Sequence, residues 1–309
     1  MTQRADLVID ELQVRYRNRG GWIPAVRDVS FTVPAGRTVG LVGESGSGKS
    51  SLAKAVTGLV PPDGGTITFA GAPVRHRPGP DGIQMIFQDP VASLHPHRAL
   101  IDLVADPLRW AGVDRTHRRE RAAAALADVG MDPVHFGGRK RHQISGGQAQ
   151  RVAIARATLA EPALIIADEP VASLDVSVQA GVVNLLHRAV DDRGASLLFI
   201  SHDLSVVSAL CDEVVVLYLG RICEHGPTES VIGSPAHPYT RALLDAVPEP
   251  GRVLAPSKLR AADPPSPSDA PSGCAFHPRC PDSVAVCRTT VPVTHDLAGV
   301  TVSCHAVTQ

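Results

Sequence analysis

A glycine-rich segment near the start of the chain has the residue types and spacing to bind the phosphates of a nucleotide. It follows the apolar run Val39 to Val42 and precedes an amphipathic stretch that is typical of a helix. Its residues are Gly43, Glu44, Ser45, Gly46, Ser47, Gly48, Lys49, Ser50 and Ser51. Glycines allow backbone N–H groups to converge on phosphate oxygens, Lys49 supplies a positive charge, and the Ser50 hydroxyl can bind Mg²⁺. The segment therefore predicts a site for a nucleoside triphosphate.

Two adjacent acidic residues offer the chemistry of phosphate hydrolysis. Asp168 and Glu169 follow the apolar run Ala163 to Ala167, which predicts a buried strand. Ligands collect where such strands end in α/β sheets. We therefore expect Asp168 to hold Mg²⁺ through water, and Glu169 to polarise the water that attacks the γ-phosphate.

The elements that must position these groups alternate along the chain. From Leu7 to about Ile232, short β-rich runs alternate with helical patterns, which predicts an α/β fold. The 309 residues suffice for one large domain with an appendage, or for two modest domains. A net charge of −1, 44% hydrophobic residues and no basic arm are typical of a soluble globular protein without a nucleic-acid partner. The sequence has neither a signal-peptide core nor a run of roughly 20 apolar residues that could span a bilayer, so we expect a cytosolic protein.

Between the two motifs lies a segment that resembles a known family. Ser145, Gly146, Gly147 and Gln148, followed by QRVAIARA, are similar to the signature motif of ATP-binding cassette (ABC) ATPases. A serine and two glycines before a helix form a second anion-binding turn, which suits a γ-phosphate. Ile144 stands where leucine is usual, a conservative change that keeps an apolar contact.

The remaining motifs of the family occur in its usual order. Tyr16 is similar to the aromatic residue that stacks on adenine, and Gln88 resembles the glutamine that senses Mg²⁺ and the permease. Ser173-Leu174-Asp175 resembles the D-loop, in which Asp175 contributes to the ATP site. His202 resembles the switch histidine that contacts the γ-phosphate. The resemblance implies that Glu169 and His202 are catalytic, and that Ser50, Gln88 and Asp168 bind Mg²⁺.

The resemblance also implies a fold and a partner. The fold is that of an ABC nucleotide-binding domain of the P-loop NTPases, with a RecA-like core, an antiparallel β subdomain and a helical subdomain at about residues 89–160, all within residues 1–232. In this family, the phosphate loop of one subunit and the signature motif of another enclose each ATP. We therefore expect a second ABC ATPase subunit, identical or paralogous, and an ATP-driven closure of the pair that hydrolysis reverses.

Three further segments are similar to the ATP-binding subunits of bacterial dipeptide/oligopeptide importers: FQDPVASLHPH, DEPVASLDVSVQA and SPAHPYTRALLDAVP. The resemblance implies an ATPase at the cytoplasmic face of the membrane, peripheral to two transmembrane permease subunits and served by an extracytoplasmic substrate-binding protein. Peptides, nickel chelates, glutathione-like compounds and sugars all remain open as cargo. An accessory subunit of a carbon–phosphorus lyase complex is an alternative interpretation.

The C-terminal extension, residues 233–309, contains a Pro-rich linker from Glu249 to Gly273 and then four cysteines, Cys274, Cys280, Cys287 and Cys304. Four thiolates suit tetrahedral Zn²⁺ or an iron–sulfur cluster, and spacings wider than those of zinc ribbons favour a cluster. The importer resemblance likewise implies a 4Fe-4S cluster at these four cysteines. Bound zinc and free or disulfide-linked thiols remain as alternatives, and a redox-sensing role for the cysteines also remains open.

Two histidines and two further cysteines lie outside this predicted ligand set. His277 and His305 stand beside the cysteines and could substitute as ligands, although a packing role is favoured for His277. Cys211 and Cys223 lie in strand-like segments and are expected to be small buried apolar residues.

Overall fold

The computed structural model describes residues 6–18, 20–74, 82–172, 174, 176–192, 194–247, 259 and 265–307. The chain forms two compact units. The helical unit comprises Met1–Asp6, Val33–Thr38 and Arg77–Phe199, and the sheet unit comprises Leu7–Thr32, Val39–His76 and Ile200–Gln309. The domain boundary expected between residues 232 and 233 falls inside the sheet unit and stays a prediction. Most of the predicted linker lies outside the described residues.

The helical unit contains a short set of strands. They are β6 (Ile83–Ile86), β7 (Leu164–Asp168) and the first four residues of β8 (Ser196–Ser201), whose last two residues belong to the sheet unit, with β7 in the middle. β6 and β7 run parallel, with Ile83 opposite Leu164. Every residue of β7 and β8 is buried, which explains their uninterrupted apolar sequences, because a strand covered on both faces has no polar side.

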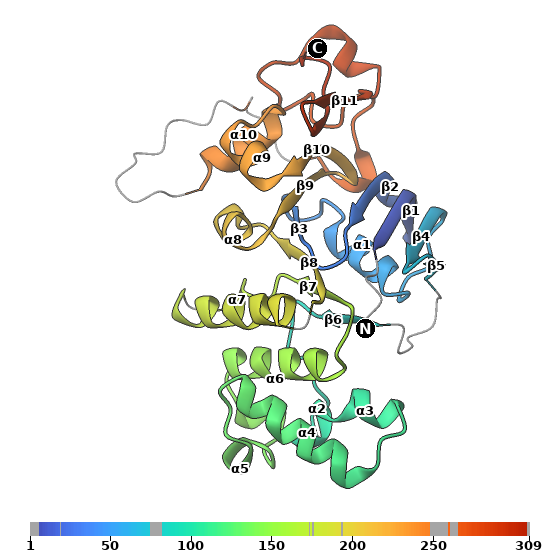
Figure 1. The fold of residues 1–309 in the computed structure, drawn as a ribbon. Coiled ribbons are helices and arrows are strands. Elements are labelled where there is room, and N and C mark those ends of the chain that lie inside the picture. The colour runs from blue at the N-terminus through green and yellow to red at the C-terminus, as the bar shows by residue number, and fades with distance from the viewer. Residues whose placement is uncertain are drawn as a thin grey trace. The chain divides into compact units, whose positions relative to one another are not determined.

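Helices make up the rest of this unit. They are α2 (Leu100–Val104), α3 (Asp106–Trp110), α4 (Arg115–Asp128), α5 (Pro133–Phe136), the 3₁₀ turn η1 (Arg141–Gln143), α6 (Gly146–Leu159) and α7 (Val176–Asp191). α6 packs against α4 and α2 (Figure 1). Its buried residues include Val152, Ala153 and Ile154 on consecutive positions, so α6 is enclosed on several sides and is the central helix of the unit.

The sheet unit contains an antiparallel sheet and a second, mixed sheet. In the antiparallel sheet, β1 (Leu7–Asn18), β2 (Gly21–Val33), β4 (Gly64–Phe69) and β5 (Ala72–Pro73) lie in the order β2-β1-β4-β5. In the mixed sheet, β3 (Thr38–Val42) pairs in parallel with β9 (Glu213–Tyr218). β9 pairs antiparallel with β10 (Arg221–Pro227). The helices are α1 (Lys49–Val56), α8 (Leu204–Leu210), α9 (Thr228–Gly233) and α10 (Pro238–Asp245).

The C-terminal tail extends this mixed sheet. After the 3₁₀ turns η2 (Pro267–Asp269) and η3 (Ala285–Arg288), β11 (Thr294–Leu297) and β12 (Val300–Ser303) form a hairpin, and β12 pairs with β10 (Figure 1). Tyr218, Tyr239 and Phe276 form an aromatic cluster beneath the tail, with ring centroids 4.6 to 5.3 Å apart. The tail is thus packed onto the same unit that carries the phosphate loop.

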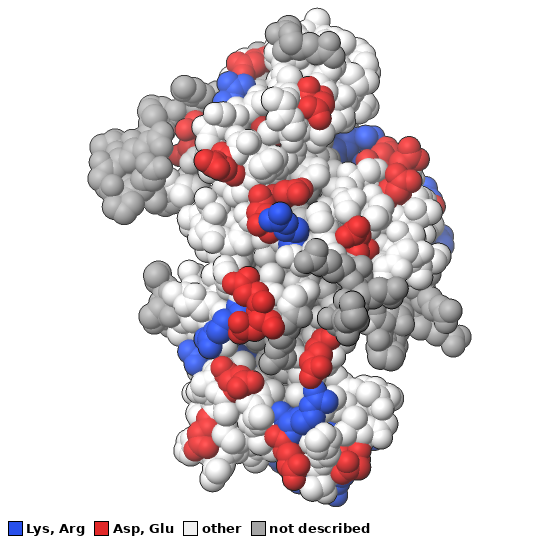
Figure 2. All heavy atoms as spheres, viewed as in Figure 1, with Lys and Arg blue, Asp and Glu red and all other residues white. Residues whose placement is uncertain are grey.

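The surface carries charges of both signs, and Lys and Arg side chains alternate with Asp and Glu over the face drawn in Figure 2. In the part of the chain that the structure describes, no helix combines the length and the apolar character that crossing a bilayer would require.

Candidate functional site

The phosphate loop takes a conformation that requires glycine. Gly43, Gly46 and Gly48 have φ values of 157°, 79° and 106°. A Cβ atom on Gly43 would lie 2.1 Å from the Leu217 carbonyl oxygen, and one on Gly48 would lie 2.2 Å from the Ala25 carbonyl oxygen. The loop is therefore pressed against the backbone of neighbouring strands, and larger residues cannot replace these two glycines without moving it.

The loop also leaves donors for an anion. Gly48 is the N-cap of α1, and because glycine has no side chain it provides no capping hydrogen bond to the first turn of the helix. The Ser47 hydroxyl is buried and has no hydrogen-bond partner. A helix N-terminus beside an unsatisfied buried hydroxyl has the chemistry that suits a phosphate group, and the assignment of these residues to the nucleotide stays a prediction.

Lys49 is held inside the loop. Its side chain is buried, and its Nζ donates to the carbonyl oxygens of Gly43 at 2.8 Å and Glu44 at 3.0 Å. These carbonyls compensate the ammonium charge and keep it beside the N-terminus of α1. Ser50 and Ser51 stand in the first turn of the same helix.

Glu44 directs most of its polar groups away from the loop. Its N–H donates to the Tyr239 hydroxyl at 2.8 Å, and its carboxylate accepts two hydrogen bonds from Arg279, at 2.7 and 2.9 Å. Sequence reasoning did not identify Tyr239 or Arg279 as site residues. Their only signal was an aromatic residue in SPAHPYTR and an arginine among the cysteines in HPRCP, neither of which points to a phosphate loop.

The predicted catalytic carboxylate lies in the helical unit, directly after β7. Gln88 Nε2 donates to Glu169 Oε2 at 2.9 Å, so the structure brings these two predicted residues together. Glu169 has a φ of 47°, an uncommon backbone conformation for a residue with a side chain. Asp168, the last residue of β7, is only 3% exposed. The end of the strand therefore presents two carboxylates in fixed and different environments.

The signature segment forms the predicted turn before a helix. Ser145 is the N-cap of α6, and its hydroxyl accepts from the Gln148 N–H at 3.3 Å while the Gln148 side chain accepts from the Ser145 N–H at 3.0 Å. This reciprocal pair is a capping box, and the Ser145 hydroxyl can still donate to an anion. A Cβ atom on Gly147 would lie 3.1 Å from Val178, so Gly147 permits close packing of α6 and α7, whereas Gly146 faces open space.

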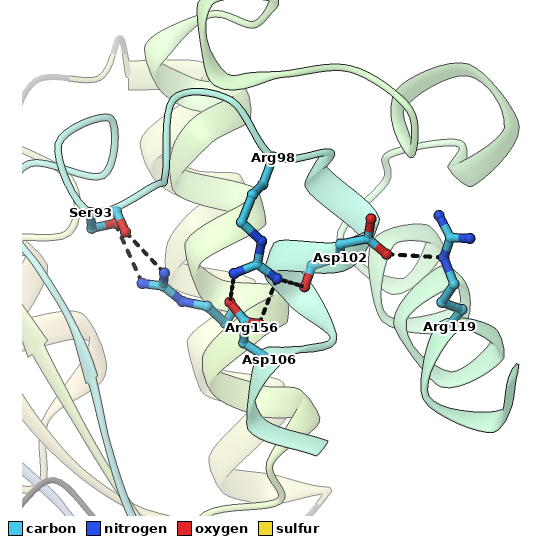
Figure 3. A network of polar contacts seen from close by, with 6 residues as sticks. All are labelled: Ser93, Arg98, Asp102, Asp106, Arg119 and Arg156. Carbon is cyan, nitrogen blue, oxygen red and sulfur yellow. Dashed lines mark hydrogen bonds and ion pairs between the residues drawn. The ribbon is translucent and has the colours of Figure 1, made fainter. Parts of the chain in front are cut away.

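A polar network fixes the segment after Gln88 against α6 (Figure 3). Arg156 of α6 donates to the backbone and side-chain oxygens of Ser93, at 3.1 and 3.4 Å. Arg98 makes two 2.7 Å hydrogen bonds to Asp106, and Arg119 pairs with Asp102 at 3.0 Å. Burial lowers the pKa of the Arg156 guanidinium, and the charge of Asp106 opposes this. The network therefore links the segment that follows Gln88 to α6, the helix that begins at the signature motif.

The remaining residues that the sequence predicts to contact the nucleotide are Tyr16, His202 and those of the D-loop. Tyr16 lies on β1 with its side chain 37% exposed, and His202 is exposed directly after β8. Ser173 and Asp175 lie outside the described residues, and only Leu174 of the predicted D-loop is described. The roles assigned to these residues from the sequence stay predictions.

The four tail cysteines lie close enough to influence one another. Burial raises the pKa of Cys274, Cys280 and Cys304, that of Cys280 to about 11. The charges of Cys287 and Cys304 further raise the pKa of Cys274, and those of Cys304 and Cys274 further raise that of Cys280. All four cysteines are free.

The thiols are not, however, assembled into a coordination shell. Within the described ranges, the structure contains no group of three or more His, Cys, Asp or Glu side chains that could hold a metal ion. His277 Nδ1 donates to the Cys274 carbonyl oxygen at 3.0 Å, and His305 Nε2 donates to that of Thr290 at 2.8 Å. Cys211 and Cys223 are each 7% exposed, which confirms that they are buried.

Comparison with known proteins gives matches along most of the chain. Residues 26–172 match the family described as ABC transporter, and residues 223–287 match the family described as oligopeptide/dipeptide transporter, C-terminal region. A putative peptide import ATP-binding protein of Brucella ovis is 44% identical over 300 residues, which are 94% of each chain. Another of Brucella abortus is 42% identical over 312 residues, 98% of this chain and 93% of the relative.

Two solved structures share the fold. A dimeric ATP-binding cassette in a post-hydrolysis state, bound to ADP and Pi, superposes with a TM-score of 0.66 at 26% identity over 72% of this chain and 98% of that chain. The cbiO1 protein of Clostridium perfringens, part of the ABC transporter complex cbiONQ, gives a TM-score of 0.64 at 27% identity over 74% of this chain and 90% of that chain.

Proposed function

Because this chain belongs to the ABC transporter family, and within it to the peptide import ATP-binding proteins, we propose that it hydrolyses ATP to power a peptide importer. The observation that carries the proposal is the identity of 44% over 94% of both chains, which includes the transporter-specific C-terminal region. The predicted nucleotide-binding fold is confirmed by the solved cassettes. The alternative, a subunit of a carbon–phosphorus lyase complex, is not favoured by any of these relatives.

Hydrolysis would use groups that the fold already orients. The N–H groups at the start of α1 bind the phosphates, and Lys49 transfers its hydrogen bonds from the loop carbonyls to phosphate oxygens. Glu169 accepts a proton from the attacking water as the bond to the γ-phosphorus forms and the bond to ADP breaks. Ser50, Gln88 and Asp168 are the proposed holders of Mg²⁺, which supplies charge neutralisation at the phosphates.

The hydrogen bond from Gln88 to Glu169 supports two of these assignments together. Because the Gln88 nitrogen engages the carboxylate, its amide oxygen is the atom left to act as an acceptor or metal ligand. The carboxylate is the group proposed to accept the proton of water. One side chain would thus orient both the base and the cation.

A second ATPase subunit would complete the site. The Ser145 turn presents a capped helix N-terminus suited to the γ-phosphate of a nucleotide held by another copy or paralogue. Asp175 and His202 are proposed to contribute at the same interface. Two permease subunits and an extracytoplasmic binding protein would be the further partners, which assigns the chain to the cytoplasmic face of a membrane. Among the possible cargoes, the names of the relatives favour peptides.

We further propose that Cys274, Cys280, Cys287 and Cys304 bind a 4Fe-4S cluster, with Zn²⁺ as the alternative. The number and spacing of the cysteines in the sequence support this proposal, and the thiols would have to move closer together to bind the centre. Iron, sulfide and zinc content of anaerobically purified protein distinguishes the two. A serine at Cys280 should abolish binding of the centre, whereas a serine at Cys211, which is remote in sequence, should not. Equal metal content in both variants would contradict the proposal.

The Glu169→Gln variant tests the ATPase function. Loss of the general base should reduce turnover roughly 100- to 10,000-fold while MgATP binding is retained. Glu161→Gln is the matched control, because Glu161 lies in the same unit and forms only an exposed ion pair with Arg121 at 2.6 Å. Steady-state hydrolysis by Glu169→Gln at the wild-type rate would refute the assigned role. Stimulation of ATPase activity in a complex with permeases and a peptide-loaded binding protein tests the transport role.

A further inference from the structure

The second residue of the phosphate loop is held from the C-terminal tail. Both terminal guanidinium nitrogens of Arg279 donate to the Glu44 carboxylate, at 2.7 and 2.9 Å. Arg279 is 7% exposed and also donates to the Tyr218 hydroxyl at 3.4 Å. Two parallel charge-assisted hydrogen bonds fix the direction of a carboxylate as well as its position. The tail therefore determines where the Glu44 side chain lies.

A second contact holds the backbone of the same residue. The Glu44 N–H donates to the Tyr239 hydroxyl at 2.8 Å. Tyr239, in α10, is 1% exposed, and its ring packs against Tyr218 and Phe276 with centroids 4.6 and 5.3 Å away. A phenol enclosed in an aromatic cluster has little freedom to follow a moving loop. Glu44 is thus fixed at both its N–H and its carboxylate.

The carbonyl group of Glu44 faces the opposite way, into the phosphate loop. It accepts a hydrogen bond from Lys49 Nζ at 3.0 Å and another from the Ser47 N–H at 3.2 Å. Any displacement of Glu44 therefore moves a group that holds the phosphate-binding lysine. One residue connects the tail on one side with the nucleotide site on the other.

We propose that Arg279 is a positioning residue of the nucleotide site, which holds Glu44, and through it Lys49, in the arrangement that accepts MgATP. This inference rests on the proposed ATPase function and adds the C-terminal tail to its machinery. A loop that is already ordered loses less conformational entropy when the nucleotide binds. Arg279 also compensates the charge of Glu44, which would otherwise repel the phosphates. Both effects make binding weaker when Arg279 is lost.

The affinity of full-length variants for MgATP, measured by titration calorimetry, tests this proposal. Arg279→Gln should bind MgATP on the order of tenfold more weakly, the change that corresponds to the loss of one strong polar interaction. The affinity of Arg279→Lys for MgATP should lie between that of this variant and that of the wild type, because lysine keeps the positive charge but cannot make the two parallel hydrogen bonds of a guanidinium group. The double variant Glu44→Gln/Arg279→Gln should recover much of the loss, since no uncompensated carboxylate remains beside the phosphates.

The matched control is Arg241→Gln. Arg241, in α10, pairs with Asp282 of the tail at 3.1 Å, so this variant removes an ion pair of the tail that does not involve the phosphate loop. Its affinity for MgATP should equal that of the wild type.

The outcomes separate positioning from stability. If Arg279 only stabilises the fold, Arg279→Gln lowers the melting temperature while folded protein binds MgATP with wild-type affinity, and the proposal is overturned. If Arg279→Gln does not fold, Arg279→Lys decides, and unchanged affinity in that variant also overturns it. Wild-type protein that fails to bind MgATP would instead refute the proposed ATPase function.

Discussion

The replacement of Gly48 by alanine should damage the nucleotide site far more than the replacement of another glycine with a positive φ in the same unit. Gly48 has a φ of 106°, and an added Cβ atom would lie 2.2 Å from the carbonyl oxygen of Ala25 and 3.5 Å from the Cα of Gly220. Gly71 is the matched control in the same unit, because its φ is 76° and nothing lies within 4 Å of an added Cβ atom. Both glycines have a positive φ, and they differ in whether an added Cβ atom would collide with neighbouring backbone.

The expected magnitudes follow from this difference. Gly71→Ala should lose only the roughly 1–2 kcal/mol that a left-handed conformation costs a residue with a Cβ atom. In Gly48→Ala, the start of α1 must also move by about 1 Å to bring the Cβ–oxygen distance of 2.2 Å to the ordinary contact distance of 3.4 Å. Lys49 follows Gly48 directly, and a misplacement of that size can reduce catalytic efficiency about 100-fold.

Two measurements on both variants test this reasoning. Thermal unfolding should show a loss in both, larger in Gly48→Ala, whereas kcat/KM for MgATP should fall steeply in Gly48→Ala and stay at the wild-type value in Gly71→Ala. If both variants retain full kcat/KM, the contact of Gly48 with Ala25 does not constrain the loop. If kcat/KM falls equally in both variants, the loss comes from general destabilisation, and the contact of the added Cβ atom with Ala25 does not explain it.

Two further predictions concern buried polar groups outside the phosphate loop. Burial, assisted by the charge of Arg241, lowers the pKa of His237 from 6.5 to about 3, so the neutral ring contributes stability that is complete above pH 6.5 and is lost as the pH falls towards 3. The free energy of unfolding measured in urea should decline by at most about 1.4 kcal/mol for each pH unit over this range, and His237→Asn should flatten the decline. An unchanged pH dependence in His237→Asn would contradict the assignment to His237. In the network of Figure 3, Arg156→Met should cost about 2 kcal/mol, because it leaves the part-buried oxygens of Ser93 without this donor. Replacement of the Asp106 side chain, which is 23% exposed, by Asn should cost only about 1 kcal/mol. Equal changes in melting temperature would show that burial does not decide the difference.

The parts of the fold that sequence predicted well are those in which local chemistry is decisive. The apolar runs before Gly43 and Asp168 are the buried strands β3 and β7, because strands covered on both faces need continuous apolar sequence. The glycines of the phosphate loop adopt positive φ values that few other residues tolerate. The serine of the signature motif caps α6 through a contact only three residues long. In each case the signal lies within one segment of the chain.

What sequence could not predict depends on contacts between distant segments. Arg279 and Glu44 are separated by 235 residues, and no periodicity or spacing connects them. The strands β11 and β12 are only four residues long and mostly half-exposed: β11 has neither alternation nor an apolar run, and the alternation of β12 is too short to identify a strand by itself. Without them, the tail was expected to be an appendage after a linker rather than a continuation of the sheet through β10.

The position of Glu44 explains how a tail could become part of a phosphate loop without disturbing it. Gly43 and Gly48 lie so close to neighbouring backbone that neither can carry a side chain, and Lys49 already donates to the Gly43 carbonyl oxygen, so these positions have no freedom to take on another contact. The N–H and carboxylate of Glu44, in contrast, both point to Tyr239 and Arg279, while its carbonyl alone serves the loop. Tyr239 and Arg279 can therefore hold Glu44 without engaging the groups of the loop that bind phosphate. Because such coupling is reciprocal, any chemistry at the cysteines next to Arg279 that shifts its side chain must change the affinity for MgATP, and MgATP must in turn stabilise the tail by the same free energy.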